Sequence, residues 1–405
     1  MYQKLHSPFK SFWIGGFECA DHLNAFGNRV DLLRRTGHIQ MIDKDYKNLA
    51  MFGIQTVREG IRWSKVERKP YSYDWSVVIK MMHAAKIYGI QQVWDICHFG
   101  FADDLFPFHP KFANRFAELC KSFVLLAKEL YPDDQLIITP INEVSFLSWL
   151  GGDAVGTTPY CTNKGWDVKY ALMRAYIEGV HAMKAIDPDI KILSTEPIVQ
   201  IVPPLEPTEQ EVQQALLEES YQYQCTDILC GNFCPELGGN DNCLDMIGVN
   251  FYYNNRWVLG YHNYLDWVKN DTRWQPLSQM LVNVFNRYQK PLIISETSHP
   301  GEDRPAWIKY IGDECIDSIR LGLPLWGVCI YPIIDRPDWD FEDRDWHRSG
   351  LWDNYTNTDT SLDRVLNEDY AAAFRDTQKL IAAELAQGQH LLNYSPNLQD
   401  EVFNR

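Results

Sequence analysis

One stretch decides the predicted fold: Gln135-Leu136-Ile137-Ile138-Thr139-Pro140-Ile141-Asn142-Glu143. A short run that is apolar at nearly every position is typical of a strand covered on both faces, as in a parallel sheet. The run ends abruptly in an amide and a carboxylate. In parallel α/β folds, polar residues at the carboxyl end of a strand lie where ligands bind.

A second run has the same design: Pro291-Leu292-Ile293-Ile294-Ser295-Glu296. Two buried strands that each end in a glutamate suggest a pair of carboxylates facing one another. The alternative is that each glutamate only caps the following helix or lies in solvent. That alternative explains one such glutamate better than it explains two.

Short apolar runs alternate with segments of helical periodicity along the whole chain. With the two runs above, the predicted strands are 12–17, 55–58, 91–96, 190–193, 244–249 and 324–330. The predicted helices are 42–51, 77–88, 112–130, 168–186, 209–223, 276–288, 305–320 and 369–385.

Eight strands alternating with helices predict a parallel sheet of the α/β class. The count of eight favours a single closed (β/α)8 TIM barrel. An open doubly wound sheet would need a nucleotide fingerprint, and neither G-x-G-x-x-G nor G-x-x-x-x-G-K-[ST] follows any of the strands. We therefore expect one barrel domain over residues 1–390 and a polar tail over 391–405.

The composition limits the possible partners. The formal net charge of −16 argues against nucleic acid or an anionic membrane surface, because both require a basic footprint. Hydrophobic residues make up 45% of the chain, yet no segment approaches the ~18 unbroken apolar residues of a membrane span. Residues 1–20 lack an apolar signal region, which leads us to expect a cytoplasmic protein. Nothing in the sequence indicates the oligomeric state.

The cysteines do not point to a metal site. Four of the ten fall within residues 225–243, but they contain no C-x-x-C pair and fit zinc spacing poorly. We interpret them as reduced thiols and predict neither a metal nor a cofactor.

In a barrel of this kind the carboxyl ends of all strands converge on one pocket. The candidate site residues are the polar and aromatic side chains predicted there: Glu18, Arg58, His98, Asn142, Glu143, Asn250, Tyr252, Glu296 and Trp326. This set is rich enough in hydrogen-bonding groups to hold a polyhydroxylated ligand. His98 could instead be a structural histidine, and Trp326 could be a tryptophan of the barrel core.

Paired carboxylates are what cleavage of a glycosidic bond requires. One must be protonated to donate to the leaving oxygen, and the other must stay ionised to meet the developing oxocarbenium carbon. Their environments must therefore push their pKa values apart. Arg58 could hold one carboxylate ionised, and Tyr252 could donate a hydrogen bond to the same group.

The pattern around Asn142-Glu143, with Glu296 at the end of a later apolar strand, resembles the clan A glycoside hydrolases. Within that clan the chain looks most like a divergent member of glycoside hydrolase family 1, the β-glucosidase family. The resemblance spans almost the whole barrel and includes these further motifs: Trp13-Ile14-Gly15, Ile61-Arg62-Trp63-Ser64, Ile247-Gly248-Val249-Asn250-Phe251-Tyr252 and Ser349-Gly350-Leu351.

The resemblance implies a retaining β-glycosidase that acts on a carbohydrate or glycoside. Glu143 would be the general acid/base and Glu296 the nucleophile. Asn142 would bind the sugar 2-hydroxyl and the nucleophile, while Arg58 and Tyr252 would orient Glu296. His98 and Trp326 would contact the glycone. Glu18 stands about where the family has a glutamine for sugar hydroxyls, and Asn250 is a further expected substrate-binding residue.

The chain also departs from the family pattern. Val144-Ser145 follow Glu143 in place of the usual proline, and Thr297-Ser298-His299 follow Glu296 in place of Asn-Gly. The glutamate-tryptophan sugar clamp is replaced by the segment 335–339. These changes put the glycone specificity in doubt, and they leave open a catalytically impaired relative that only binds carbohydrate.

A metal-dependent hydrolase is a third hypothesis. Its ligands would come from Asp95, His98, His109 and His299, but no H-x-H or H-E-x-x-H pattern supports it.

Overall fold

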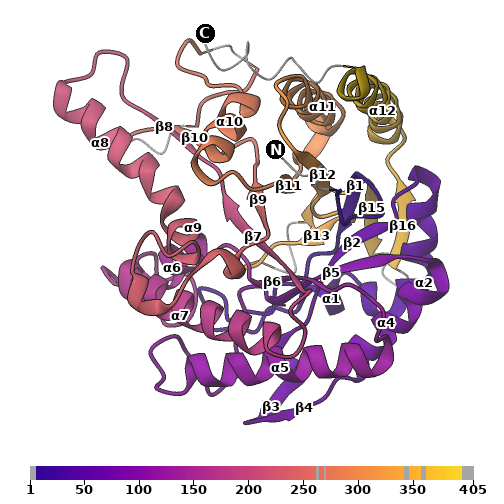
Figure 1. Cartoon of the computed structure of the whole chain (residues 1–405), viewed down its shortest axis with the longest axis vertical. Helices are drawn as coiled ribbons and strands as arrows, with labels where there is room; N and C mark the ends of the chain where they lie inside the picture. Colours follow the sequence, from indigo (N-terminus) through magenta and orange to yellow (C-terminus); the bar gives the residue numbers. More distant parts are fainter. Residues whose placement is uncertain (1–5, 261–263, 269–270, 342–345, 357–361, 395–405) are drawn as a thin grey trace.

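The computed structural model describes residues 6–260, 264–268, 271–341, 346–356 and 362–394. Eight parallel strands close into a barrel (Figure 1), in the chain order β1 (Trp13–Gly16), β2 (Thr56–Gly60), β5 (Gln91–Cys97), β6 (Ile137–Ile141), β7 (Lys191–Pro197), β9 (Met246–Asn250), β11 (Leu292–Thr297) and β12 (Leu325–Ile330). The pairing of Trp13 with Val328 joins the first strand to the last. Each strand overlaps its predicted range, so the prediction of a single (β/α)8 barrel is confirmed.

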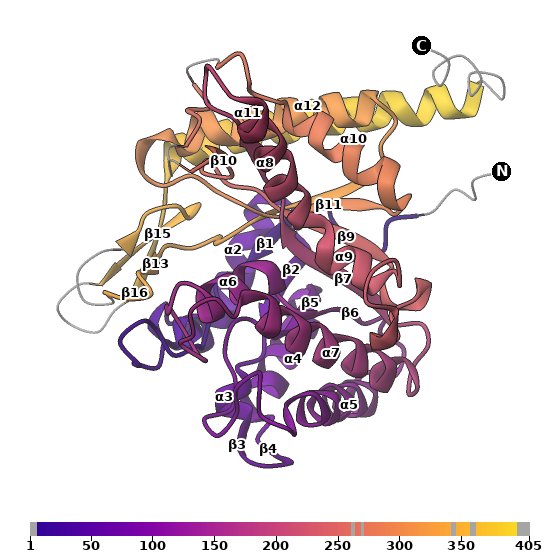
Figure 2. The same cartoon turned by 90° about the vertical axis from the view of Figure 1, so that its left-hand side faces the viewer.

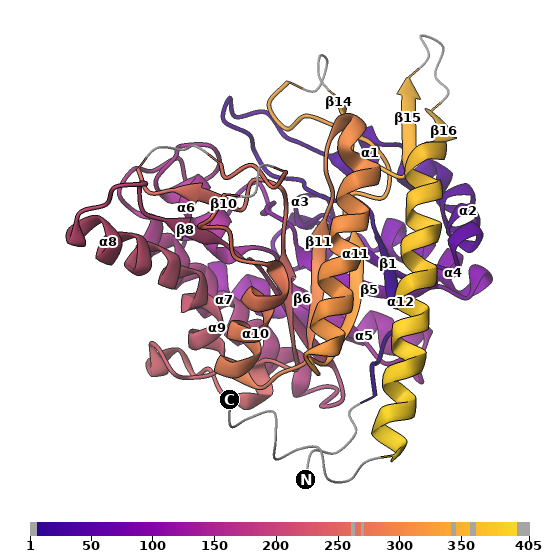
Figure 3. The same cartoon turned by 90° about the horizontal axis from the view of Figure 1, so that it is seen from above.

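Helices surround the barrel, as the alternating pattern predicts. The main ones are α2 (His38–Leu49), α4 (Ser76–Tyr88), α5 (Phe112–Leu130), α7 (Gly165–Lys184), α8 (Glu209–Ser220), α10 (Leu277–Tyr288), α11 (Arg304–Arg320) and α12 (Glu368–Tyr394). In α5 the buried side chains include Phe112, Phe116 and Phe123, which recur at helical spacing and form the stripe that packs inward. Figure 3 shows α11 and α12 side by side along one flank of the barrel.

The last helix is longer than predicted. It extends past residue 385 to Tyr394 and so crosses the predicted domain boundary at 390. Residues 395–405 of the predicted tail lie outside the described residues.

The barrel interior changes from apolar to polar toward the carboxyl ends of the strands. Seven strands each contribute one residue to an apolar layer: Ile14, Val93, Ile137, Leu193, Met246, Ile293 and Cys329. Two positions further along four of these strands the buried residues are polar: Asp95, Thr139, Thr195 and Ser295. Arg58 of β2 is buried beside them and is paired with Asp95. Because residues i and i+2 of a strand share a face, both layers point into the barrel. The polar layer forms the floor under the glutamates at the strand ends.

Several short elements were not predicted. The helix α6 (Val144–Gly152) begins directly after Glu143. Two ribbons are β15 (Trp352–Thr356) with β16 (Leu362–Leu366), which are antiparallel, and β8 (Gln200–Val202) with β10 (Arg256–Val258), which are parallel. Figure 2 shows β15 and β16 extending away from the barrel, beyond the helices.

None of the helices in the described ranges is both long and apolar enough to cross a lipid bilayer.

Candidate active site

Glu296 is the most firmly held carboxylate of the candidate site. It lies near the end of β11 and is 4% exposed. The Arg58 guanidinium donates to its Oε1 at 2.6 Å, and the Tyr252 hydroxyl donates to its Oε2 at 2.7 Å. A positive charge and a hydroxyl donor on opposite oxygens favour the ionised form of this carboxyl group.

Arg58 connects this carboxylate to the rest of the polar floor. Its Nε donates to Asp95 Oδ1 at 3.0 Å, and its Nη2 donates to Asn142 Oδ1 at 2.6 Å. Burial alone raises the pKa of Asp95, but the Arg58 and His98 charges outweigh burial and hold that pKa below its usual value. The arginine therefore lies between two carboxylates, Asp95 and Glu296, and orients both.

Asn142 and His98 are oriented by this floor. Asn142 Oδ1 also accepts from the Thr195 hydroxyl at 2.7 Å, which leaves the amide NH2 on the other side, 3.4 Å from His98 Nε2. His98 Nδ1 donates to Asp95 Oδ2 at 2.8 Å, so its Nε2 points away from Asp95. Burial opposes the charged form of His98, but Asp95 and Glu18 outweigh it and raise the pKa.

Glu143 has a different environment. It lies between β6 and α6 with φ 46° and ψ 57°, the left-handed region, and it is only partly buried. Asn250 Nδ2 donates to its Oε1 at 2.8 Å, and Asn250 is in turn oriented by the Ser295 hydroxyl, which donates to Oδ1 at 2.6 Å. Desolvation, followed by the nearby charge of Glu296, raises the pKa of Glu143 well above its ordinary value.

Glu18 follows β1 and lies beside His98, with Oε1 3.6 Å from His98 Nε2. Its Oε2 is 3.1 Å from Arg336 Nε, and its Oε1 accepts from the backbone N–H of Ala20 and from the Tyr331 hydroxyl at 3.1 and 3.4 Å. The carboxylate is thus fixed by an ion pair and two further donors, with its oxygens close to His98 Nε2.

Trp326 is not brought to this pocket. It is the second residue of β12 and packs, half-buried, with Phe9 against the apolar interior layer. Tyr331, the first residue after the strand, occupies the position expected of Trp326. The Tyr331 hydroxyl lies 3.2 Å from His98 Nε2, and the centre of the Tyr331 ring lies 5.2 Å from the Arg58 guanidinium carbon. Gly16 leaves room for that ring, since a Cβ there would meet it at 2.1 Å. Trp326 is therefore a tryptophan of the barrel core.

The structure brings together the other eight predicted residues: Glu18, Arg58, His98, Asn142, Glu143, Asn250, Tyr252 and Glu296. It adds others that the sequence analysis did not assign to the carbohydrate site: Asp95, Thr195, Glu196, Tyr331 and Arg336. Of these, Glu196 stands at the end of a predicted strand, which is the signal that identified Glu143 and Glu296. Arg336 begins the two-residue strand β13 (Arg336–Pro337), which lies beyond the last barrel strand, and carries no such signal.

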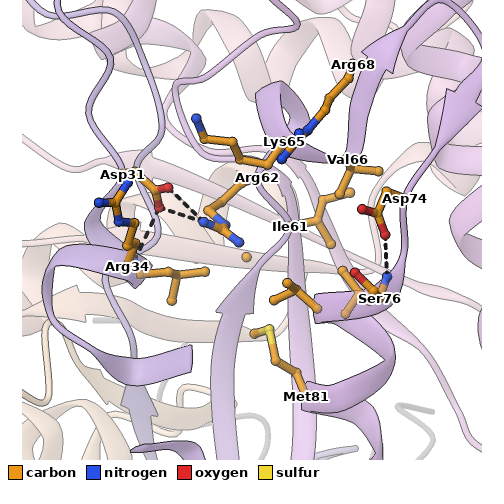
Figure 4. Close-up of a pocket in the computed structure, with 14 residues that line it drawn as sticks. Asp31, Arg34, Ile61, Arg62, Lys65, Val66, Arg68, Asp74, Ser76 and Met81 are labelled. Carbon is orange, nitrogen blue, oxygen red and sulfur yellow. Dashed lines mark hydrogen bonds and ion pairs between the residues drawn. The ribbon is translucent and has the colours of Figure 1, made fainter. Parts of the chain in front are cut away.

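Two cavities are present, and neither Glu143 nor Glu296 lines them. One, of about 250 Å³, is lined by residues just after β2 and by α1 (Leu32–Arg35), α3 (Trp63–Val66) and α4 (Figure 4). In it Arg62 donates to both carboxylate oxygens of Asp31 at 2.8 Å. The other, of about 610 Å³, includes Phe99, the residue after His98, and further aromatic side chains of the neighbouring loops.

The hypothesis of a metal-dependent hydrolase gains little from the geometry. Across the described ranges, the one group of three potential ligand atoms is Cys19, Asp95 and His98, and Asp95 there is already paired with Arg58. His109 and His299 are not members of it; their Nδ1 atoms meet a backbone N–H and a backbone carbonyl. The cysteines at 225–243 are free thiols and form no such group in the part of the chain that is described.

No protein-family model matches the chain, and no curated protein sequence does. Solved structures do share its fold. The family 1 β-glucosidase from Thermotoga maritima superposes with a TM-score of 0.67 at 15% identity, over 85% of this chain and 86% of that one. The β-glycosidase from Pyrococcus horikoshii gives a TM-score of 0.68 at 15% identity, over 86% of this chain and 88% of that one. The chain therefore has the barrel fold of the family 1 glycosidases, as its sequence resemblance implies.

The Thermotoga maritima β-glucosidase has also been solved with glucoimidazole. That structure matches with a TM-score of 0.68 at 15% identity, over 85% of this chain and 87% of the other.

Proposed function

We propose that the chain is a retaining β-glycosidase, with Glu143 as general acid/base and Glu296 as nucleophile. The observation that carries the proposal is the contrast between the two carboxyl groups. Glu296 accepts from a cation and a hydroxyl, whereas the pKa of Glu143 is raised by burial and by Glu296 itself. One ionised and one protonated carboxyl group close together are the two partners that glycosidic cleavage needs.

In the first step Glu296 attacks the anomeric carbon. A bond forms between its free oxygen lone pair and that carbon while the bond to the leaving oxygen breaks, and Glu143 transfers its proton to the leaving oxygen. Arg58 and Tyr252 keep the attacking carboxylate charged and oriented until the covalent ester forms.

In the second step Glu143, now a carboxylate, removes a proton from water. The water oxygen bonds to the anomeric carbon, the ester to Glu296 breaks, and both glutamates return to their starting states. Two inversions at one carbon give net retention. This mechanism predicts carboxyl groups about 5–5.5 Å apart, the separation of retaining enzymes.

We assign the glycone to the polar side of the pocket. Asn142 presents its amide NH2 there, and His98 Nε2 and Glu18 offer further partners for sugar hydroxyls. The solved structures of the Thermotoga maritima β-glucosidase hold glucoimidazole or deoxynojirimycin, which supports a sugar-sized ligand in this fold. The substrate we propose is a small carbohydrate or glycoside.

The test is hydrolysis of a panel of aryl β-glycosides that differ only in the glycone. We expect turnover of at least one, with retention at the anomeric carbon observed by proton NMR. A matching 2-deoxy-2-fluoro glycoside should leave a covalent sugar on the peptide that contains Glu296. Sugar binding without turnover across the panel would instead favour the catalytically impaired relative, and an inverted product would refute the double displacement.

A further inference from the structure

The residues after the acid/base depart from the family pattern, and the structure shows what meets them. Val144 and Ser145 open α6, and both face Glu196 at the end of β7. The backbone N–H of Val144 donates to Glu196 Oε1 at 2.7 Å, and that of Ser145 donates to Oε2 at 3.0 Å. The Ser145 hydroxyl also donates to Oε2.

We propose that Glu196 is a positioning residue that holds the general acid/base Glu143 in place, by binding the two backbone N–H groups and the hydroxyl that follow it. This inference rests on the proposed function of Glu143. It assigns Glu196 the task of fixing the start of α6, where the family pattern has a proline.

The first reason is hydrogen bonding. A proline has no N–H, whereas Val144 has one, and a buried N–H without an acceptor is unfavourable. Glu196 is 8% exposed and supplies that acceptor. Three donors converge on its two oxygens, and a carboxylate can accept all three of these hydrogen bonds.

The second reason is the backbone of Glu143. Its left-handed conformation is uncommon for a residue with a Cβ, so the surrounding structure must hold it. A following proline favours extended conformations of the residue before it, which is a different geometry. Here the N–H of Glu143 donates to the Thr195 carbonyl at 2.9 Å, and Glu196 binds the next two N–H groups. Two adjacent residues of β7, Thr195 and Glu196, therefore bind the backbone N–H of Glu143 and the two N–H groups that follow it.

The third reason is charge. A carboxylate beside the start of α6 adds to the repulsion that keeps Glu143 protonated, alongside Glu296 and against the opposing Arg58. Burial raises the pKa of Glu196 itself, while the Ser145 donors and the charge of Lys169 oppose that rise. The titratable and charged groups near Glu143 or Glu196 come from β2, β11, α7 and α9: Arg58, Glu296, Lys169, Tyr176 and Cys225.

The test compares Glu196→Gln with Glu219→Gln in the full chain. Glu219 is a matched control, because it is a partly buried carboxylate of α8 that accepts the Ile201 N–H at 2.9 Å, on a different part of the fold. The first readout is the titration midpoint of the Glu143 carboxyl group. Infrared difference spectroscopy monitors this titration, and Glu143→Gln identifies the band of Glu143. We expect the midpoint to move to lower pH in Glu196→Gln and to stay in place in Glu219→Gln. An unmoved midpoint in both variants would contradict the contribution of the Glu196 charge to Glu143.

The second readout is kcat/KM for two leaving groups. A misplaced acid should matter for phenyl β-glycosides, which need protonation, and little for 2,4-dinitrophenyl β-glycosides, which do not. We expect Glu196→Gln to lose roughly tenfold to a hundredfold with the first, the loss typical of a hydrogen bond to a charged group, and little with the second. An equal loss with both would indicate general damage and would contradict positioning.

Two outcomes keep the proposals separable. If Glu196→Gln does not fold, Glu196→Asp retains the charge with a shorter reach, and it should keep the Glu143 midpoint while still losing activity selectively on phenyl glycosides. If the native chain hydrolyses no glycoside, the proposed function fails, whereas the infrared titration still decides whether Glu196 governs Glu143.

Discussion

Glu143 and Glu296 are the same side chain in two different surroundings, although both end a strand of one barrel. Glu296 is buried and accepts from Arg58 and Tyr252 at 2.6 and 2.7 Å. Glu143 is partly exposed and receives one neutral donor, Asn250, at 2.8 Å. A charged partner favours ionisation, and desolvation without a cation in contact opposes it.

The contrast arises from the strands that supply the neighbours of each glutamate. Arg58 lies on β2, and its guanidinium forms ion pairs with Asp95 of β5 and with Glu296 of β11. Glu143 meets its neighbours through β7 and β9, which present Glu196 and the amide of Asn250. The position of one arginine therefore distinguishes the carboxylate that we propose as nucleophile, Glu296, from the proposed acid/base, Glu143.

The largest expected effect separates the two glutamates by deletion. We expect Glu296→Ala to lose at least about 10⁴-fold in kcat, since removal of a nucleophile can cost as much or more in other enzymes. Glu143→Ala should lose about 10²–10⁴-fold with poor leaving groups, the usual worth of general acid catalysis, and much less with good ones. Added azide should give the α-glycosyl azide from the first variant and the β-glycosyl azide from the second. The reverse pairing of products would exchange the two roles.

A smaller effect should follow from removing one donor of Glu296. We expect Tyr252→Phe to lower kcat/KM roughly tenfold to a hundredfold, because a hydrogen bond to a charged group is worth about 1.5–3 kcal/mol. Tyr253→Phe is the neighbouring control; its ring packs on His299 with centroids 4.6 Å apart. The control should stay within about twofold of the native enzyme. Equal kinetics for the two variants would show that Tyr252 does not support the nucleophile.

The sequence could predict those parts of this site that depend on one strand alone. Glu143 and Glu296 each follow an apolar run, so the strand-end rule placed them without knowledge of any neighbour. The same rule favours Tyr331 over Trp326. Tyr331 directly follows the predicted strand 324–330, whereas Trp326 lies near the start of that strand. Trp326 is the second residue of β12 and packs with Phe9, so it does not meet the strand-end criterion by which it is predicted.

Other contacts could not be read from the sequence because they depend on register between strands or on loop paths. Arg58 meets Asp95 only because β2 and β5 pair in a particular register, with Arg58 opposite Val93. Arg336 forms an ion pair with Glu18 from a segment without hydrophobic periodicity, far from Glu18 in the sequence. Hydrophobic periodicity determines the elements but carries no information on such pairings.

A third prediction concerns stability against pH. The pKa of Glu143 is higher in the folded chain than in the unfolded one, so its protonated form stabilises the fold fully below about pH 4, near the unfolded value. That contribution is lost as the pH rises through the folded value. Glu143→Gln does not ionise, and its melting temperature should exceed that of the native chain at pH 8 by an amount on the order of a few degrees. The difference should shrink toward pH 4, as measured by calorimetry.

Buried His38 is the reason for measuring a difference rather than a single curve. Burial opposes its charged form, but Glu59 and Asp45 outweigh burial and raise its pKa to about 9. The stability from this charged histidine is complete below its ordinary pKa of 6.5 and is lost as the pH rises to about 9. Both proteins share that loss, so it cancels. A pH-independent difference between them would mean that Glu143 ionises normally.

The smallest expected effect comes from the opposite end of the barrel. Trp326 packs with Phe9 below the apolar layer and touches neither carboxylate environment, so Trp326→Phe should leave kcat/KM within about twofold for every leaving group. The matched variant is Tyr331→Phe, which removes a hydroxyl that lies 3.2 Å from His98 Nε2 and donates to Glu18 at 3.4 Å. That variant should raise KM more than Trp326→Phe does, while leaving the pH profile of Glu143 unchanged. If Trp326→Phe instead weakened substrate binding as strongly as Tyr331→Phe, the pocket would have to extend through the apolar layer, and the contrast between the two glutamates would no longer be set at the carboxyl end alone.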